Sequence, residues 1–254
     1  MGESLMKYGF WIKASLFFLV SALALFALSV TLGAFDRSGD ASGDESQPVN
    51  ADFPKYSTVI IDAGHGGEDG GASSAAGLVE KDVNLEIAQM LCDMLEATGV
   101  DVIMTREDDR LLYDRNTDYR GRKKKLDLAA RLAIADSTEN AIFISIHMNS
   151  FTDPRYSGLQ VWYSPNNADS SVLAELIRSK NGEKLQPYNT RKTKAATSAI
   201  NILYNAKCPA VLVECGFLSN PDEAALFETQ EYRQKVAFML FCSITEFLND
   251  TQNT

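Results

Sequence analysis

The chain has 254 residues, 45% of them hydrophobic, which is enough for one domain with a buried core but cramped for two. Its formal net charge of −10 argues against nucleic acid as a partner. The four cysteines lack the paired CxxC spacing of a zinc cluster, so we expect mostly buried free thiols at Cys92, Cys208, Cys215 and Cys242. The strand-like run "PAVLVE" would hold Cys208 and Cys215 about 20 Å apart, too far for a disulfide.

The N-terminal 35 residues are predicted to be a membrane anchor or a signal peptide. Lys7 and Lys13 precede 22 charge-free residues from Ala14 to Phe35, enough to span a bilayer as a helix. The segment is longer than a usual signal core and lacks a small-x-small cleavage site, which favours a retained anchor. Residues 36–54 carry five acidic side chains and one arginine and few large apolar ones, so they are predicted to be a flexible acidic linker. We therefore expect an exported protein that is either anchored or secreted.

Residues 55–254 are predicted to form one α/β domain. Short β-branched runs alternate with segments of helical period, which indicates a twisted, mostly parallel sheet of five to six strands with helices on both faces. The runs "VDVIMT" and "AIFISI" are apolar almost throughout, so both are expected to be central strands. The predicted strands are residues 57–62, 100–105, 141–147, 158–164 and 210–214. The predicted helices are residues 81–98 (starting near Glu80), 126–135, 169 to beyond 177, 196–203 and 232–248.

Both histidines of the chain follow predicted strands. His65 comes shortly after Asp62 at the end of the first strand, and His147 ends the third strand, followed by Asn149. In sheets of this kind, ligands bind at the carboxyl ends of the strands. Neutral imidazole is a common zinc ligand, and a catalytic zinc site needs three protein ligands and one open position. The two histidines together therefore predict a metal site whose third protein ligand has to be found elsewhere in the chain. Either histidine alone would be an ordinary turn residue.

Glu80 is the candidate for that third ligand. The glycine-rich connection from His65 to Glu80 is long enough to bring the start of the following helix back over the strand end. Glu68 and Asp69 in the same loop are alternatives. A glutamate in the first turn of a helix also stabilises the helix dipole without any metal.

Glu214 follows the apolar run "AVLV", where a carboxylate is costly unless it is paired or lies near a cation. A carboxylate beside a zinc-activated water is the general base of metal-assisted hydrolysis. The alternative is a structural salt bridge to Arg191 or Lys194. Asp62 and Asn149 are close enough in sequence to orient the histidine rings, or they fix turns.

Seven segments carry a family resemblance. In order they are "VIIDAGHGGEDGG", "LVEKDVNLEIA", "VIMTRE", "AARLAIA", "FISIHMNS", "SGLQVWYS" and "PAVLVECGFLSNPDEA". Together they resemble the zinc-dependent N-acetylmuramoyl-L-alanine amidases of bacterial cell walls, amidase family 3, over residues 57–249. The short chain with its hydrophobic N-terminus and the stretch "RGRKKKLDLAAR" also resemble the sporulation and germination amidases of spore-forming bacteria. Asp136 departs from the asparagine usual in the family and puts the local helix capping in question.

The resemblance implies hydrolysis of the amide between the lactyl group of N-acetylmuramic acid and L-alanine of the stem peptide, in vegetative or spore-cortex peptidoglycan. Position by position, His65, Glu80 and His147 match the zinc ligands, and Glu214 matches the catalytic glutamate. Glu214 would take a proton from water and pass it to the leaving amine. An activator protein is a further expected partner.

Two basic groups are candidates for contacting the carboxylates of the stem peptide, Arg120–Lys125 and the trio Arg191, Lys192 and Lys194; a solvated surface is the alternative. Two other functions remain open. The first is an inactive wall-binding or regulatory domain of the same fold. The second is a metal-free glycosidase with paired carboxylates, which chelation and the mass of the product would distinguish from an amidase.

Overall fold

The computed structural model describes residues 55–114, 116 and 119–252. The predicted anchor or signal peptide (residues 1–35) and the predicted linker (36–54) lie outside these residues. The chain divides into the units Met1–Ala51 and Asp52–Thr254, and the described residues all belong to the second. Within the described part of the chain, every helix is too short or too polar to cross a membrane.

Six strands form one sheet: β1 (Thr58–Ala63), β2 (Asp101–Met104), β3 (Ala141–Asn149), β4 (Gln160–Tyr163), β5 (Lys194–Ala195) and β6 (Ala210–Phe217). Their order across the sheet is β2-β1-β3-β6-β4-β5. Strands β2, β1, β3 and β6 are parallel, whereas β4 runs antiparallel to β6 and β5 is parallel to β4. The segment between β3 and β4 holds no helix, so β4 is reached without the helical crossover typical of parallel strands. The predicted mostly parallel sheet is confirmed.

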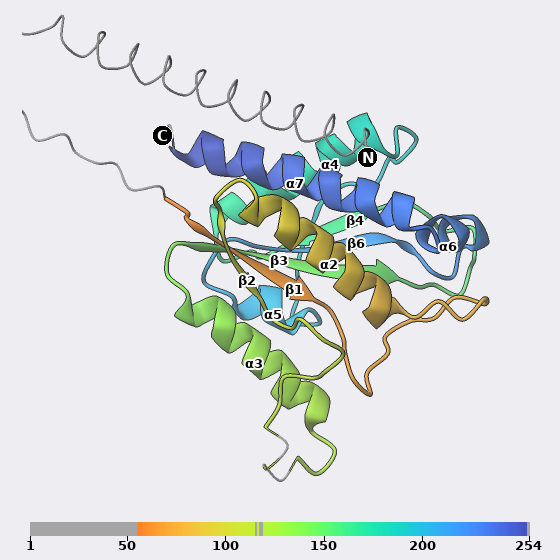
Figure 1. Cartoon of the computed structure of the whole chain (residues 1–254), viewed down its shortest axis with the longest axis horizontal. Helices are drawn as coiled ribbons and strands as arrows, with labels where there is room; N and C mark the ends of the chain where they lie inside the picture. The colour runs from red at the N-terminus through yellow and green to blue at the C-terminus, as the bar shows by residue number, and fades with distance from the viewer. Residues whose placement is uncertain (1–54, 115, 117–118, 253–254) are drawn as a thin grey trace, which may run out of the picture. The chain divides into compact units, whose positions relative to one another are not determined.

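Helices cover both faces of this sheet (Figure 1). They are α2 (Glu80–Glu96), α3 (Lys123–Ser137), α4 (Ala168–Lys184), α5 (Asn201–Asn205), α6 (Pro221–Phe227) and α7 (Gln230–Gln252). Helices α2 and α4 pack on one face, with α7 against both of them, and α3 and α5 pack on the other face. The sheet is therefore the middle layer of the predicted α/β domain.

Alternation along each strand divides the interior into two cores. On β1, Val59 and Ile61 face the α2, α4 and α7 side, whereas Ile60 faces the α3 and α5 side. On β3, Ile144 joins the first core and Phe143 the second. All of these side chains are fully buried, which is why the two strands read as continuous apolar runs in the sequence.

One strand position was predicted wrongly. The run "VDVIMT" corresponds to β2, which is an edge strand and not a central one. Only one of its faces is covered: Val102 and Met104 pack against the α2 side, while Ile103 is 37% exposed on the other side. The apolar run indicates a hydrophobic strand, but it does not show whether one or both faces of that strand are covered.

Two elements were not predicted. Strand β5 is only two residues long, and both of them are exposed, so no sequence pattern identifies it. Helix α6 does have a signal: Asn220 accepts hydrogen bonds from the backbone N–H groups of Asp222 and Glu223, and Pro221 occupies the first turn. The predicted helix 196–203 is also misplaced, since α5 begins only at Asn201.

The four cysteines are free thiols as predicted, but only Cys215 is fully buried. Asp136 has a tertiary role in place of a capping role. Its Oδ1 accepts a hydrogen bond from the backbone N–H of Lys207 at 3.2 Å, on the segment that leads into β6. This contact ties the end of α3 to that segment.

Candidate metal centre

The two histidines and Glu214 lie at one edge of the sheet, as the strand ends predict. His147, near the end of β3, pairs in register with Glu214 on β6, so the two side chains leave the same face of the sheet. His65 is the second residue after β1, the strand on the other side of β3. The parallel strands β1, β3 and β6 therefore present their carboxyl ends together.

The glycine-rich loop 64–79 folds back over this edge and positions Glu80 at the start of α2. The backbone N–H of Glu80 donates to the carbonyl of Ala72 at 2.9 Å, and that of Lys81 donates to the carbonyl of Gly70 at 3.1 Å. Helix α2 has no side-chain N-cap, so these loop carbonyls satisfy the first N–H groups of the helix. These hydrogen bonds join the loop to the first turn of α2, so the loop fixes the position of Glu80.

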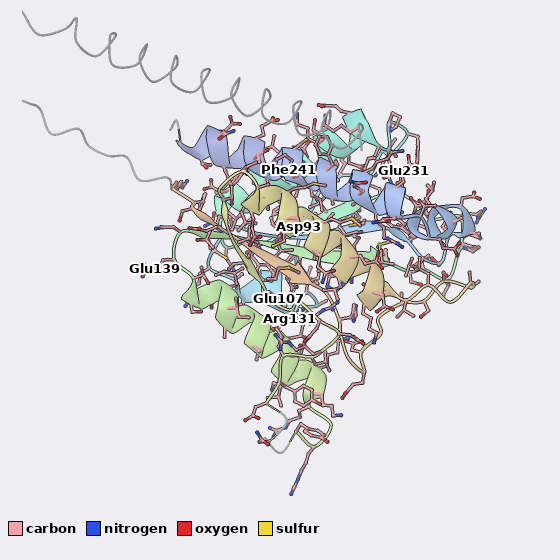
Figure 2. All side chains as sticks on the ribbon, viewed as in Figure 1. Asp93, Glu107, Arg131, Glu139, Glu231 and Phe241 are labelled. Atoms are coloured by element: carbon pink, nitrogen blue, oxygen red, sulfur yellow. The ribbon has the colours of Figure 1, made fainter. Side chains whose placement is uncertain are left out.

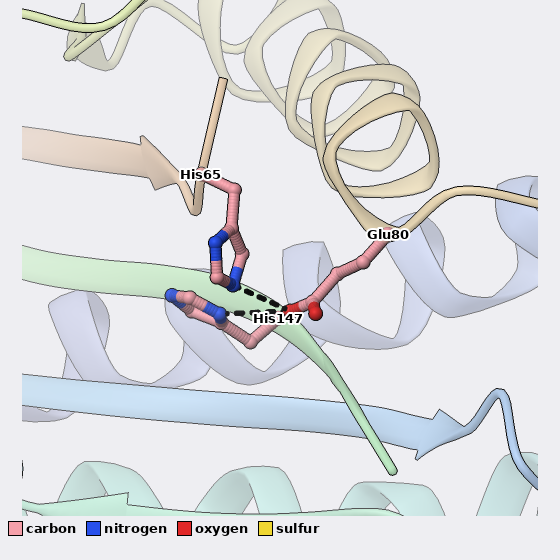
Figure 3. A group of neighbouring side chains, drawn as sticks. All are labelled: His65, Glu80 and His147. Atoms are coloured by element: carbon pink, nitrogen blue, oxygen red, sulfur yellow. Dashed lines mark hydrogen bonds and ion pairs between the residues drawn. The ribbon is translucent and has the colours of Figure 1, made fainter. Parts of the chain in front are cut away.

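One carboxylate oxygen lies between the two imidazoles (Figure 3). Glu80 Oε1 is 3.2 Å from His65 Nε2 and 2.9 Å from His147 Nδ1. The three potential ligand atoms all lie within 4.8 Å of one another. The second oxygen, Oε2, accepts the backbone N–H of Ala72 at 2.7 Å, which fixes the direction of the carboxylate. Two imidazoles and one carboxylate are a ligand set of catalytic zinc sites, so these residues fit the metal that the family resemblance implies.

The glycines of the loop allow this close packing. A Cβ on Gly64 would lie 2.2 Å from His147 Nε2, and a Cβ on Gly71 would lie 2.4 Å from Glu80 Oε2. His65 itself has a φ of 63°, a left-handed conformation that is uncommon outside glycine. The surrounding contacts must therefore hold the His65 backbone in this conformation.

The electrostatics of the group suit a cation. Burial raises the pKa of the Glu80 carboxyl, but hydrogen bonds with His147 and His65 outweigh burial and hold that pKa well below its ordinary value. Burial lowers the pKa of His65, but Glu80 and Asp69 raise it above its ordinary value. Glu80 is therefore an anion that draws positive charge into the space between the rings.

Glu214 lies at this edge with a different environment. Burial raises the pKa of its carboxyl, and Glu80 adds to this effect while the histidines oppose it. Its Oε2 is buried and has no hydrogen-bond partner among the described residues. The salt bridge to Arg191 or Lys194, the structural alternative, is not formed: Arg191 stacks on Phe217, and Lys194 lies over Trp162. A buried carboxylate oxygen without a hydrogen-bond partner is costly, so it fits a site in which a bound cation and substrate supply the missing interactions.

The other candidate ligands in the loop, Glu68 and Asp69, do not contact both imidazoles. Glu68 forms an ion pair with Lys123. Asp69 Oδ2 lies 3.0 Å from His65 Nδ1 and 3.6 Å from Lys124 Nζ, so it contacts one histidine from its outer side. Only Glu80 reaches both imidazoles.

Asp62 and Asn149 do not hydrogen-bond to either histidine ring in the described structure. Asn149 Oδ1 accepts the backbone N–H of Ser150, which fixes a turn. Asp62 is buried and accepts hydrogen bonds from Ser145 at 2.6 Å, Thr105 at 2.8 Å and Arg131 at 2.6 Å. It therefore anchors the layer beneath the histidines.

Two buried arginines complete that layer, and no sequence pattern predicted their role. Arg131 on α3 (Figure 2) donates to the carbonyls of Ala63 at 2.8 Å and His65 at 2.7 Å, as well as to Asp62. Arg106 donates to the carbonyls of Ala63 at 2.8 Å and Gly64 at 3.1 Å. They hold the backbone at His65 in its left-handed conformation. Their presence in "VIMTRE" and "AARLAIA" was a signal, but nothing in the sequence tied them to this turn.

A cavity of about 220 Å³ opens next to these residues, on the α3 and α5 side of the sheet. His65, His147 and Glu214 line one part of it, and Phe143, Leu212 and Leu203 form an apolar part. Of the two basic groups, Lys124 borders this cavity and Arg191 borders a separate hollow. The arrangement provides a polar, ligand-bearing rim beside an apolar space.

Comparison with known proteins gives a consistent result. The sequence model of the N-acetylmuramoyl-L-alanine amidases matches residues 59–246. The germination-specific N-acetylmuramoyl-L-alanine amidase of Bacillus subtilis is 36% identical over 192 residues, which cover 76% of this chain and 80% of that protein. The amidase LytC of Bacillus subtilis is 33% identical, covering 71% of this chain and 33% of its own length.

Solved structures of such enzymes share the fold. The CwlD amidase of Clostridioides difficile, solved in complex with the GerS lipoprotein, superposes with a TM-score of 0.72 at 36% identity. That match covers 76% of this chain and 99% of the other. AmiC2 of Nostoc punctiforme superposes with a TM-score of 0.61 at 29% identity, covering 77% and 98%.

Proposed function

This chain belongs to the N-acetylmuramoyl-L-alanine amidase family, and from this premise we propose that its reaction takes place beside His65, Glu80, His147 and Glu214. As a peptidoglycan amidase, it hydrolyses the amide between the lactyl group of N-acetylmuramic acid and L-alanine of the stem peptide. The observation that carries the site assignment is the convergence of one Glu80 oxygen with both imidazoles. These positions coincide with the only two histidines of the chain.

We propose that His65, Glu80 and His147 hold a zinc ion. Zinc at such a site acts as a Lewis acid and lowers the pKa of water to about 7. The ionised Glu80, directed by the Ala72 N–H, offers an oxygen to the cation, and the loop around Gly64 and Gly71 keeps the three side chains close. Arg131 and Arg106 hold the chain at His65 and so preserve the geometry without touching the metal.

Glu214 is proposed as the general base and then the general acid. It removes a proton from water as the oxygen attacks the lactyl carbonyl carbon, and it delivers that proton to the departing nitrogen of L-alanine. A C–O bond forms and the C–N bond breaks, leaving a lactyl carboxylic acid, which then ionises to solvent, and a free amine. Burial, which raises the pKa of the Glu214 carboxyl, helps it to hold the proton between the two steps.

The biological setting is proposed from the relatives. A germination-specific relative supports spore-cortex peptidoglycan as the substrate. The CwlD amidase was solved with the GerS lipoprotein, so a partner protein that activates this chain is also proposed. Export, with residues 1–35 as anchor or signal peptide, rests on the charge-free segment Ala14–Phe35.

The reaction can be tested by digesting purified cortex and vegetative peptidoglycan with zinc or with EDTA, followed by mass analysis of the products. We expect free stem peptides, intact glycan chains and loss of activity in EDTA. Cleaved glycan chains would instead indicate a glycosidase, and no cleavage of either material even with the proposed partner protein added would indicate a non-catalytic domain.

The metal site can be tested by elemental analysis of purified variants. Glu80→Gln and His147→Ala should lose most of the bound zinc, because each removes one of the three convergent ligands. Asp69→Asn is the matched control, since Asp69 contacts only the outer side of the His65 ring, and it should retain most of the zinc. Full zinc content in Glu80→Gln would contradict the assignment.

A further inference from the structure

The two basic groups of the sequence differ in how their charges are used. Within the first group, Lys123 forms an ion pair with Glu68 and lies 4.5 Å from the centroid of the Tyr119 ring. Within the second group, Arg191 forms no ion pair with any carboxylate of the described residues. Arg191 is therefore a cation that has been positioned but not paired.

Aromatic rings hold the Arg191 guanidinium in place. Its Cζ lies 4.7 Å from the centroid of the Phe217 ring and 5.8 Å from that of Tyr156. Its Nε donates to the carbonyl of Ser157 at 2.8 Å. A guanidinium has five N–H donors in a planar fork, so one edge remains for a ligand that accepts two hydrogen bonds, such as a carboxylate.

Arg191 lines an open hollow of about 480 Å³. Tyr156 and Tyr188 form part of its wall and are 46% and 62% exposed. The acidic residue in the wall, Asp153, is already hydrogen-bonded to Arg155 through both of its oxygens. The hollow is therefore amphipathic, and Arg191 provides its unpaired charge.

A buried carboxylate fixes the walls of the hollow. Glu223 on α6 accepts the backbone N–H of Gly158 at 2.8 Å through Oε1 and that of Phe217 at 2.7 Å through Oε2. Burial raises the pKa of the Glu223 carboxyl, and the two N–H groups and the charge of Arg191, acting through space, oppose it. Both oxygens of Glu223 accept backbone N–H groups, which leaves the donors of Arg191 other than Nε to a ligand from outside.

The register of the sheet places this hollow next to the candidate metal centre. His147 pairs with Glu214 and Asn149 pairs with Phe217, so two residues of β3 match three of β6 across a β-bulge. The bulge brings Glu214 and Phe217 to the same face although they are three residues apart. Two residues of strand correspond to about 7 Å. An extended peptide advances by about 3.5 Å per residue, so a carboxylate about two residues from a bond held at Glu214 can reach Arg191.

We propose that Arg191 binds a free carboxylate of the stem peptide about two residues from the scissile amide, with Tyr156 and Tyr188 covering the peptide beside it. This inference rests on the proposed function, because it assumes that the scissile amide lies at Glu214. Arg191 is then a specificity-determining residue, and the amidase distinguishes stems with a free carboxylate from stems in which that group is a carboxamide.

The test compares two soluble muramyl peptides that differ only at this group, one a free acid and one a carboxamide, cleaved by the full chain with added zinc. Wild type should have about tenfold higher kcat/KM for the acid than for the carboxamide. This is the difference expected when a charge-assisted hydrogen bond is present with one substrate and absent with the other. Arg191→Gln should abolish this preference, because it should lower kcat/KM for the acid much more than for the carboxamide. Arg191→Lys should be intermediate, because it keeps the charge but not the planar fork.

Arg178→Gln is the matched control, since Arg178 forms an exposed ion pair with Glu175 on α4, and it should keep the wild-type preference. An unchanged preference in Arg191→Gln, equal loss on both substrates, or a wild type without preference would each overturn this proposal and leave the proposed function intact. A wild type that cleaves neither substrate, and no peptidoglycan even with the proposed partner protein added, would overturn the proposed function and this inference with it.

Discussion

The two faces of the sheet use the same strands but bury different groups. On the α2, α4 and α7 side, the strands contribute aliphatic side chains such as Val59, Ile144 and Val213 to a largely apolar core. On the α3 and α5 side, the residues toward the carboxyl ends of the strands are Asp62, Ser145, His147 and Glu214, and charged residues of α3 lie against them. The strands therefore present mostly aliphatic side chains on one face, and on the other they present both histidine-side polar groups and Glu214 toward their carboxyl ends.

This difference shows how one strand can serve both purposes. On β3, Phe143 belongs to the smaller core, Ser145 to the polar layer and His147 to the metal centre, so one face changes character over a short distance. The opposite face of β3 remains apolar, with Ile142, Ile144 and Ile146. The packed apolar face stabilises the strand, and this offsets the free-energy cost of burying polar groups on the other face.

The sharpest test of the polar face is Glu214→Gln. Replacing the general base should lower kcat by about a hundredfold to ten-thousandfold, while the bound zinc and the unfolding free energy stay close to those of wild type. Hydrolysis kinetics, elemental analysis and urea unfolding measure the three quantities. Retention of more than a tenth of the activity would show that another group moves the proton.

Arg131→Met breaks the polar layer itself. Removing this guanidinium leaves Asp62 and Asp127 buried without their counter-charge, and we expect a loss of about 3–5 kcal/mol in unfolding free energy. It also removes the donor to the His65 carbonyl, so zinc affinity should fall at temperatures where the protein is still folded. Urea unfolding and zinc titration check both effects. A variant that is destabilised but binds zinc normally would separate the arginine from the site.

Leu240→Ala is the corresponding change on the apolar face. Leu240 of α7 is fully buried, and truncation should cost about 2–5 kcal/mol through lost burial and a cavity. At a temperature where the variant is folded, kcat and zinc content should match wild type. A parallel loss of zinc would contradict the separation of the two faces.

Acid should weaken the polar face first. Burial raises the pKa of Asp62, but Arg131 and Ser145 outweigh it and hold that pKa below its ordinary value of about 4. A lowered carboxyl pKa stabilises the fold above the unfolded pKa, and this contribution is lost as the pH falls below about 4. The unfolding free energy of Asp62→Asn should therefore change less between about pH 5 and about pH 3 than that of wild type. Equal slopes would show that Asp62 does not contribute.

The sequence by itself determined the chemistry and most of the elements. Alternating β-branched and amphipathic runs predicted the α/β sheet, and the strand ends at His65, His147 and Glu214 marked one edge of it. Those signals are local, because hydrophobic periodicity and residue type are read from residues close together along the chain. The resemblance to the amidases then selected Glu80 over Glu68 and Asp69, which local pattern alone left open.

Only the tertiary structure decided which residues meet. It placed "VDVIMT" at the sheet edge, because strand order depends on how layers pack and not on the run itself. It brought Arg131 and Arg106 onto the carbonyls around His65, and it left Arg191 without a paired carboxylate beside Phe217. These contacts join side chains that are distant in sequence, and such contacts form only when folding brings the segments together.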